Sequence, residues 1–295
     1  MGLSWQQGPL GRHPTGHLFV PDGPTPARLL FIEPLRRRMS VRFAGRRIAL
    51  SDAVILLHEP ARYPVAYFPV PDIDPGALEP GGRMTEHPDL GPTRWFTVRA
   101  GGSAAPRGAW RHIDPPAGAQ ALRETVAFAW RAMDAFLEED ERILGHAADS
   151  YHRIDIRASR RHLVVTHAGR VVADTTAPLV LYESGFAPRW YVPRADTNPG
   201  ALTPVDGQTF CPYKGVASYY DVHGSSRAAW SHPNAYPEVV RIADMVSFEP
   251  DRVHIALDGE RLHPAPGQAV IAHGIDRDLS PGEARTPAPG RPPWS

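Results

Sequence analysis

The feature that most constrains the fold of this chain is an internal repeat. Residues 41–80 align with residues 165–204 at a constant offset of 124 positions, without a gap, and 17 of these 40 positions are identical. Further along, the offset falls to 120, and Ala109-Trp110 meets Ala229-Trp230. Repetition at a fixed spacing indicates two copies of one structural unit. Each copy spans about a hundred residues, which is an ordinary size for a domain.

We therefore predict two homologous domains, at residues 36–140 and 155–262, joined by a linker at residues 141–154. An N-terminal extension at residues 1–35 precedes them, and its sequence does not define a fold. The tail at residues 263–295 is rich in proline and poor in large apolar residues, a composition typical of disordered segments.

The pattern within each copy predicts short antiparallel strands. In the second copy, two β-branched runs flank the turn at Ala168-Gly169, which is typical of a hairpin. The 33 prolines and 26 glycines favour many turns over long helices. The predicted fold class is mainly β, with two homologous antiparallel domains of a sandwich-like or barrel-like kind in tandem. Further strands of the second copy are expected at residues 178–182, 189–192, 217–222, 227–230, 245–248 and 253–257.

The segment at residues 119–141 is ambiguous, because its apolar residues recur near helical spacing. The repeat, however, places residues 126–128 on a strand. We therefore expect a strand there, followed by a short helix at residues 132–139 between the two domains.

Charge and cysteine content exclude several classes of function. The chain has 32 basic and 32 acidic residues, so it lacks the clustered positive charge of a nucleic-acid-binding protein. A single cysteine excludes an internal disulfide framework and a CxxC zinc site. No stretch has the length of a membrane span or the pattern of a signal peptide. We expect a cytoplasmic protein with no nucleic-acid or membrane partner, no bound metal and no cofactor, since the glycine loops that hold nucleotides are also missing.

One short stretch of the second copy, Phe210-Cys211-Pro212-Tyr213-Lys214-Gly215, contains the only cysteine and the only lysine of the chain. A lysine amine can shift its pKa and act as a base or nucleophile, which an arginine cannot. A thiol three residues from this amine is expected to have a lowered pKa. Cys211 and Lys214 are therefore the catalytic candidates. The alternative is a small buried thiol and a turn lysine that serve packing alone.

The first copy is expected to lack this motif. We take its comparable region to be residues 93–101, which hold neither a thiol nor an amine, and Ala66 replaces Trp190. This comparison predicts that the second domain carries the function and that the first is a scaffold or a wall of the site. In the alternative, both domains are structural and the motif is a turn specific to the second.

Eight further residues are candidates for binding a ligand. Aromatic walls suit a flat or apolar ligand, although Tyr67 and Trp110 repeat two of the aromatics and favour core packing for those two. The candidates are Glu183, Arg189, Trp190, Tyr191, Asp196, Tyr213, Tyr219 and Trp230.

The two acidic candidates have structural alternatives. Glu183 is costly to bury unpaired, so we expect an ion pair with Arg189 or Lys214, and Glu59 repeats it in the first copy. Asp196 also repeats, as Asp72, and is expected to cap the Pro-Gly loop that follows it. Either acid would serve as a general base if it lay within reach of a reacting group.

Two histidines, His223 and His232, flank Trp230 closely in the sequence. Either would form a nucleophile–base pair with Cys211 if the fold brought them together. Metal binding by these histidines and Asp221 is a further alternative, although no HxH or HxxxH spacing supports it.

The motifs of the second copy resemble the DUF427 family, whose name marks a domain without an established function. The residues that carry the resemblance are Glu183-Ser184-Gly185, Arg189–Pro193, Cys211–Gly215, Ala217–Tyr220, Ala229-Trp230 and Val246–Phe248. The resemblance covers residues 36–260 and implies a β-tent domain, the fold type of methionine sulfoxide reductase B. Many proteins of that fold bind zinc through two CxxC pairs, which this chain does not contain. The family name transfers no reaction.

Three classes of function stay open from the sequence. The first is an enzyme that acts on a small organic metabolite through Cys211 and Lys214. The second is a non-catalytic module that binds a small molecule in an aromatic pocket. The third is a structural or partner-binding protein that pairs through exposed strand edges.

Overall fold

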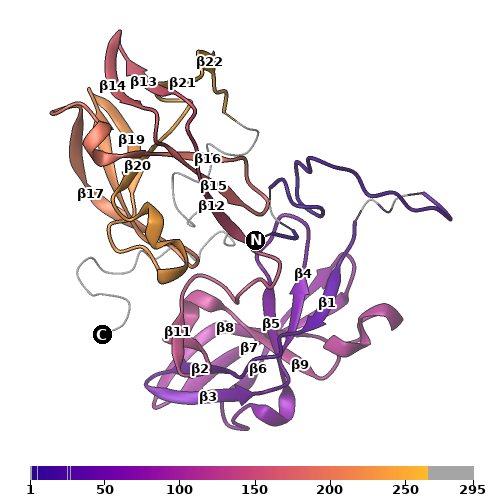
Figure 1. Ribbon diagram of the computed structural model, residues 1–295. Helices are drawn as coiled ribbons and strands as arrows, with labels where there is room; N and C mark the ends of the chain where they lie inside the picture. Colours follow the sequence, from indigo (N-terminus) through magenta and orange to yellow (C-terminus); the bar gives the residue numbers. More distant parts are fainter. Residues whose placement is uncertain (1, 5, 25, 27, 265–295) are drawn as a thin grey trace. The chain divides into compact units, whose positions relative to one another are not determined.

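The computed structural model describes residues 2–4, 6–24, 26 and 28–264, and every structural statement below refers to these residues. They form two units, shown in Figure 1. The first unit comprises residues 26–148. The second comprises residues 149–264 together with the N-terminal segment 2–24. The expected N-terminal extension is thus divided between the units, and the expected disordered tail lies outside the described residues from 265 onward.

Each unit contains one seven-stranded and one four-stranded antiparallel sheet, which confirms a mainly β fold in two copies. The larger sheet of the first unit has the order β1 (Phe31–Pro34), β4 (Ile55–His58), β5 (Val65–Pro69), β9 (Thr125–Phe128), β8 (Ser103–His112), β7 (Gly91–Ala100) and β6 (Leu78–His87). The smaller sheet has the order β11 (Glu141–Ile143), β10 (Ala135–Glu138), β2 (Met39–Phe43) and β3 (Arg46–Ser51).

The second unit repeats this topology strand for strand in its larger sheet. That sheet has the order β12 (Ile154–Ala158), β15 (Leu179–Glu183), β16 (Arg189–Pro193), β20 (Met245–Phe248), β19 (Ser225–Ser231), β18 (Gly215–Val222) and β17 (Leu202–Cys211). The smaller sheet has the order β14 (Arg170–Thr175), β13 (Leu163–His167), β21 (His254–Leu257) and β22 (Glu260–Arg261). Short 3-10 turns complete the units: η1 (Val70–Asp72), η2 (Ala117–Leu122), η3 (Trp130–Ala132), η4 (Arg194–Asp196) and η5 (Pro237–Ile242).

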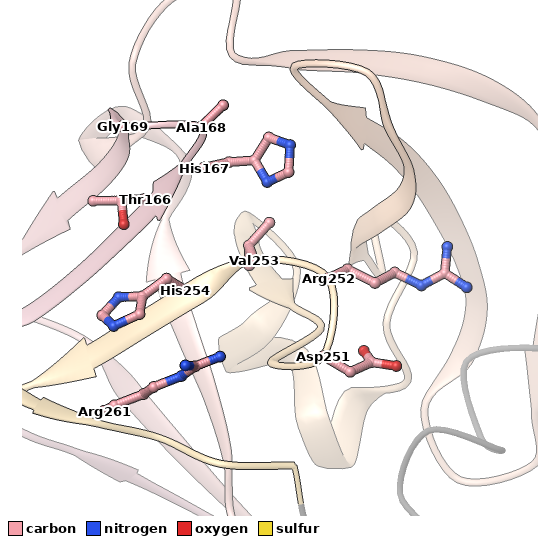
Figure 2. A pocket seen from close by; sticks show the side chains of 9 residues that line it. All are labelled: Thr166, His167, Ala168, Gly169, Asp251, Arg252, Val253, His254 and Arg261. Carbon is pink, nitrogen blue, oxygen red and sulfur yellow. The ribbon is translucent and has the colours of Figure 1, made fainter.

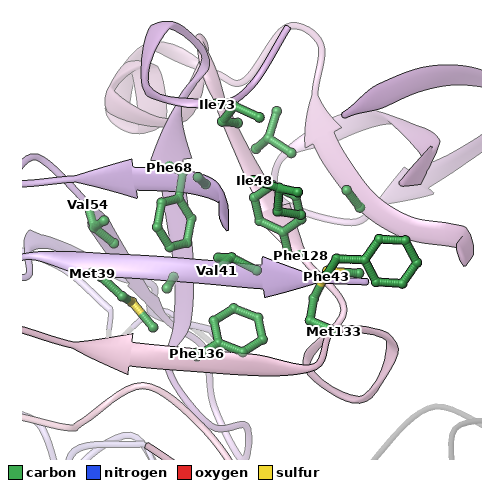
Figure 3. Close-up of a cluster of buried hydrophobic side chains, with 14 of the residues drawn as sticks. Met39, Val41, Phe43, Ile48, Val54, Phe68, Ile73, Phe128, Met133 and Phe136 are labelled. Carbon is green, nitrogen blue, oxygen red and sulfur yellow. The ribbon is translucent and has the colours of Figure 1, made fainter. Parts of the chain in front are cut away.

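The main core of the first unit lies between its two sheets. Figure 3 shows phenylalanines from both sheets meeting there, among them Phe68 of β5 and Phe136 of β10. Each of these two side chains is at most 2% exposed. The second unit buries an equivalent cluster that includes Val165 and Phe248.

The central strands of each large sheet are buried on both faces, so they read as continuous apolar runs rather than alternating ones. In β5, Phe68 points into the main core, whereas Tyr67 joins a second cluster on the opposite face with Leu122 of η2. In the second unit, Tyr191 of β16 and Ile242 of η5 form the matching second cluster. This second face carries the candidate site.

The strand pattern was largely predictable, but the helix expected at residues 132–139 was wrong. A 3-10 turn ends at Ala132, and residues 135–138 form strand β10, which pairs with β2 in antiparallel register. Tertiary pairing overrides the helical spacing, because Phe136 gains a place in the core opposite Val41. Strand β17 was not predicted, since Pro204 and Gly207 interrupt it, and the register of its pairing with β18 shifts between Val205 and Gln208.

The helical elements are all short turns. Within the described part of the chain, no helix has both the length and the apolar character that crossing a membrane would require.

Candidate functional site

The centre of the candidate site is a buried ion pair between Glu183 and Lys214. Glu183 ends strand β15, and Lys214 lies in the three-residue turn between β17 and β18. Lys214 Nζ donates to both carboxylate oxygens of Glu183, at 2.6 and 2.5 Å. The side chains are only 13% and 7% exposed. Of the two partners expected for Glu183, Lys214 is therefore the one that the fold supplies.

The ion pair fixes the charge of both groups. Burial alone would raise the pKa of Glu183, but the charge of Lys214 and the hydrogen bond from His152 hold it at about 2. Burial would lower the pKa of Lys214, yet the neighbouring Cys211 and Glu183 groups raise it above its ordinary value. Lys214 is therefore a fixed positive charge and not a free amine near neutral pH.

Cys211 differs from the expectation that its pKa is lowered. The residue is only partly exposed, and burial raises the pKa of its thiol, while the charge of Lys214 only partly offsets this effect. Burial disfavours the thiolate more strongly than one nearby ammonium favours it. Cys211 is therefore a protonated thiol in this structure.

His152 completes the surroundings of Glu183. Its Nε2 lies 3.1 Å from Glu183 Oε1, and its ring stacks on Tyr213 with the ring centres 3.6 Å apart. The hydroxyl of Tyr213 accepts a hydrogen bond from the backbone N–H of Asp149 at 3.2 Å. Burial lowers the pKa of His152, and its Nδ1 has no hydrogen-bond partner among the described residues.

His232 directly follows strand β19 and lies close to the Glu183–Lys214 ion pair. It is 2% exposed, and its Nδ1 also lacks a hydrogen-bond partner in the described part of the chain. Burial, helped by the charge of Lys214, lowers the pKa of His232 to about 3. The imidazole is therefore neutral at pH 7.

Strand register explains which predicted residues meet. Side chains alternate between the faces of a strand, and residues directly opposite each other share a face. Tyr191 is opposite Ser247, Ser247 is opposite Trp230, and Trp230 is opposite Tyr219. We call this surface of the seven-stranded sheet the site face. By the same alternation it also carries Glu183, Arg189, His232 and Glu249.

Arg189 and Trp230 form an adjoining group on the site face. The guanidinium carbon of Arg189 lies 5.0 Å from the centre of the Trp230 ring. Arg189 Nη2 lies 3.4 Å from Glu249 Oε1. Burial raises the pKa of Glu249 despite this arginine. Tyr219 bonds Thr209 through its hydroxyl at 2.7 Å, beside this group.

Two candidates lie apart from the ion pair. Trp190 projects to the opposite face of β16, packs against the main core and has Arg161 over its ring at 5.8 Å. Asp196 accepts a hydrogen bond from Thr175 at 2.6 Å, as Asp72 does from Ser51 in the first unit. The repeated pair supports the structural interpretation of Asp196.

The first unit has a direct counterpart of the Cys211–Gly215 turn, which corrects the expected comparison with residues 93–101. In the first unit His87 pairs with Gly91, as Cys211 pairs with Gly215 in the second, and each pair encloses three residues. His87 therefore corresponds to Cys211, and Leu90 to Lys214. The offset of 124 continues through Pro88 and Gly91, which match Pro212 and Gly215, so the sequence did contain this signal.

The equivalent glutamate in the first unit is satisfied by a different set of partners. Glu59 is 2.9 Å from His87 and within 3.8 Å of both Arg28 and Arg62. Arg28 lies four residues before Ile32, as His152 lies four residues before Ile156, and these two isoleucines pair with equivalent leucines. The sequence comparison missed His152 because it lies in the predicted linker.

The histidine on the sheet also differs between the units. In the first unit, His112 Nε2 lies 3.0 Å from the Tyr67 hydroxyl, and His112 Nδ1 lies 2.9 Å from Thr93 Oγ1. Ala217 occupies the position of Thr93 in the second unit. The second unit therefore has the histidine without the hydroxyl that would satisfy its Nδ1.

No candidate residue lies in a metal-like cluster: among the described residues, no group of three or more His, Cys, Asp or Glu side chains is arranged to hold a metal ion.

Comparison with known proteins supports the repeat. Residues 31–139 and residues 155–259 each match a family described as "Domain of unknown function (DUF427)". The two matches together cover more than half of the chain. No functionally curated protein matches the sequence.

Proposed function

The chain belongs to the DUF427 family, and because that family is described only as a domain of unknown function, we propose its function from the geometry around Glu183. We propose that the second unit binds a small uncharged polar molecule on the site face, beside Lys214 and Cys211. The observation that carries this proposal is the pair of buried imidazole nitrogens, Nδ1 of His152 and Nδ1 of His232, that have no partner among the described residues.

An unpaired buried polar atom is costly. Each costs about 1–3 kcal/mol, and few persist in native proteins without water, an ion or a ligand. The first unit shows that this fold can avoid the cost at one of the two positions, since both nitrogens of His112 are bonded. The loss of that arrangement in the second unit supports a site whose missing partner comes from outside the chain.

The charges around the site favour an uncharged ligand. Lys214 and Glu183 neutralise each other, and burial keeps His232 neutral. A neutral imidazole nitrogen either donates or accepts, depending on its tautomer. A hydroxyl or amide group can do both, so either group suits these nitrogens.

The chemistry available at rest is binding and polarisation rather than attack by a thiolate. An ammonium has three donors, and the Lys214 amine uses Glu183 for two of its contacts. A remaining donor would polarise a carbonyl of the ligand. Cys211 is protonated and would contribute a weak S–H donor. A lone thiol also suits action in the reducing cytoplasm.

A thermal-shift screen of uncharged polar metabolites tests the proposal. We expect hits that stabilise the wild-type chain and lose their effect in His232→Phe, while the matched variant His112→Phe in the first unit keeps the ligand-induced shift. Mass analysis of each hit after incubation separates a binding protein from an enzyme. The proposal fails if no compound stabilises the wild type and His232→Phe is more stable than the wild type, because the unpaired nitrogen would then be a structural cost alone.

A further inference from the structure

A separate feature of the second unit is an open cleft of about 470 Å³ beside the β13–β14 hairpin. This volume lies within the range of small-molecule sites. The cleft is lined from the four-stranded sheet and the segment before β21, whereas Cys211 and Lys214 belong to a turn of the seven-stranded sheet. Figure 2 shows the lining side chains, which are Thr166, His167, Ala168, Gly169, Asp251, Arg252, Val253, His254 and Arg261.

At the equivalent place in the first unit, beside the turn of the β2–β3 hairpin, a carboxylate of the chain itself is bound. Gly45 and Gly169 hold the same place in their hairpin turns, with φ of 73° and 74°. The Gly45 N–H donates to Asp134 Oδ2 at 2.8 Å. An acceptor at this position satisfies an exposed turn N–H that the hairpin cannot pair internally.

The second unit has lost that acid. Arg42 pairs with Ala135 in the first unit, and the equivalent Thr166 pairs with His254. The run from Phe248 to His254 is one residue shorter than the run from Phe128 to Ala135. Val253, which precedes His254, is buried in the core as Met133 is, so the position of the acid is absent from the second unit. Among the described residues, no side chain accepts a hydrogen bond from the Gly169 N–H.

Both units have an arginine at this place. Arg142 and Arg261 occupy equivalent positions on β11 and β22, since they pair with Leu137 and Ala256. Arg142 donates to the Asp134 backbone carbonyl at 2.8 Å. The Arg261 guanidinium has neither a hydrogen bond nor an ion pair to any residue that the structure describes.

The single acid of the cleft does not replace the lost carboxylate. In Figure 2, Asp251 and Arg252 lie on one side of Val253, while His254 and Arg261 lie on the other. Arg252 is already engaged, because its guanidinium donates to the Ser226 carbonyl. The remaining polar groups of the cleft therefore include an arginine, two histidines and the Gly169 backbone N–H, with Gly169 and Arg261 toward opposite ends of the view in Figure 2.

We propose that this cleft binds a small organic carboxylate in the place that Asp134 fills in the first unit. One carboxylate oxygen accepts the Gly169 N–H, and Arg261 donates a charge-assisted hydrogen bond to the ligand. His254 and His167 border the bound group. Recognition of the carboxylate is thus copied from an intramolecular contact that the other half of the chain retains.

Titration of the full-length, isotope-labelled chain with succinate at constant ionic strength tests this proposal, with inorganic phosphate in a parallel titration. We expect saturable amide shifts centred on Gly169 with succinate. Arg261→Gln should weaken binding by about tenfold or more, the usual effect of losing a hydrogen bond to a charged group. Arg142→Gln, the matched change in the first unit, should leave the affinity unchanged.

An aspartate inserted between Val253 and His254 provides a second test, because it restores the spacing and the acid of the first unit. We expect this variant to bind no succinate, since its own carboxylate occupies the cleft. Absent shifts at Gly169 in the wild type, or equal affinity in the wild type and Arg261→Gln, would overturn the proposal. Binding of phosphate without succinate would overturn the assignment of a carboxylate.

Discussion

Replacing Lys214 with leucine isolates the contribution of the buried ion pair, because Leu90 occupies the same position in the first unit. The pKa of Glu183 is about 2 in the folded chain, against an ordinary value of 4.5. At 1.36 kcal/mol for each pKa unit, the ionised carboxylate contributes about 3 kcal/mol to folding at neutral pH. Breaking a buried pair by removing one partner costs a similar amount, about 3–5 kcal/mol. We therefore expect Lys214→Leu to lose about 3 kcal/mol at pH 7.

The same prediction also specifies the direction in which stability changes with pH. A carboxyl group whose folded pKa is depressed stabilises the protein above its unfolded pKa and loses this contribution as pH falls through the folded value. The wild type should therefore lose stability between about pH 4.5 and pH 2. In Lys214→Leu, the pKa of Glu183 rises, so the two proteins should approach each other in stability toward pH 2.

Urea unfolding at pH 7 and at pH 2.5 measures both effects, with amide exchange in β15 and β18 to assign the transition to the second unit. Glu183→Gln combined with Lys214→Leu should be less damaging than Lys214→Leu alone, because no unpaired charge remains. Adding His152→Arg and Cys211→His to Lys214→Leu, which installs the equivalents of Arg28 and His87, two of the three partners of Glu59, should restore part of the loss. A Lys214→Leu variant as stable as the wild type at pH 7, or one with the same deficit at both pH values, would refute this reasoning.

Three further predictions concern neighbouring groups. Cys211 should react with iodoacetamide at pH 7 more slowly than a cysteine in the unfolded chain, because burial raises the pKa of its thiol; an equal rate would contradict this. Thr93→Ala should cost the first unit about 1–3 kcal/mol by leaving His112 Nδ1 unpaired, whereas Ala217→Thr should stabilise the second unit and block the proposed ligand, as unfolding and thermal-shift measurements would show. Gly215→Ala should cost about 1–3 kcal/mol in unfolding free energy, because φ is +90° and a Cβ would lie 3.0 Å from the Asn234 carbonyl oxygen; an unchanged midpoint would contradict it.

Much of the fold was predictable because the repeat presents equivalent strands in two different stretches of the sequence. The hairpin at Ala168-Gly169 and the strands at residues 189–192 and 245–248 lie where the pattern placed them. The segment at 132–139 failed because its helical spacing competes with a strand position that only β2 reveals. Local spacing carries no information about a partner strand that is almost a hundred residues away.

The candidate site was predictable in its centre but not in its surroundings. Burial of Glu183 required a cation, and the only lysine supplied it. The raised pKa of the Cys211 thiol was not predictable, because it depends on how deeply the turn is buried. Nor was His152, because it is the fold that brings the start of the second unit against β15.

The two halves of the chain differ at two equivalent places, and these differences bear on the proposed binding role. On the site face, Thr93 satisfies His112 in the first unit, and its replacement by Ala217 leaves His232 without that bond. At the cleft, the acid that satisfies Gly45 is absent beside Gly169. Random drift would remove some polar groups together with their partners, since a lone buried group is costly. Retention of the buried, unsatisfied His232 nitrogen is expected if a molecule from solution replaces the lost hydroxyl, whereas the Gly169 N–H is exposed and its acceptor can also come from solution. Restoring both lost groups, by Ala217→Thr and the inserted aspartate, should therefore raise the stability of the ligand-free chain and abolish both binding activities. A doubly restored chain that is no more stable than the wild type would show that the lost side chains had never been the partners of these groups.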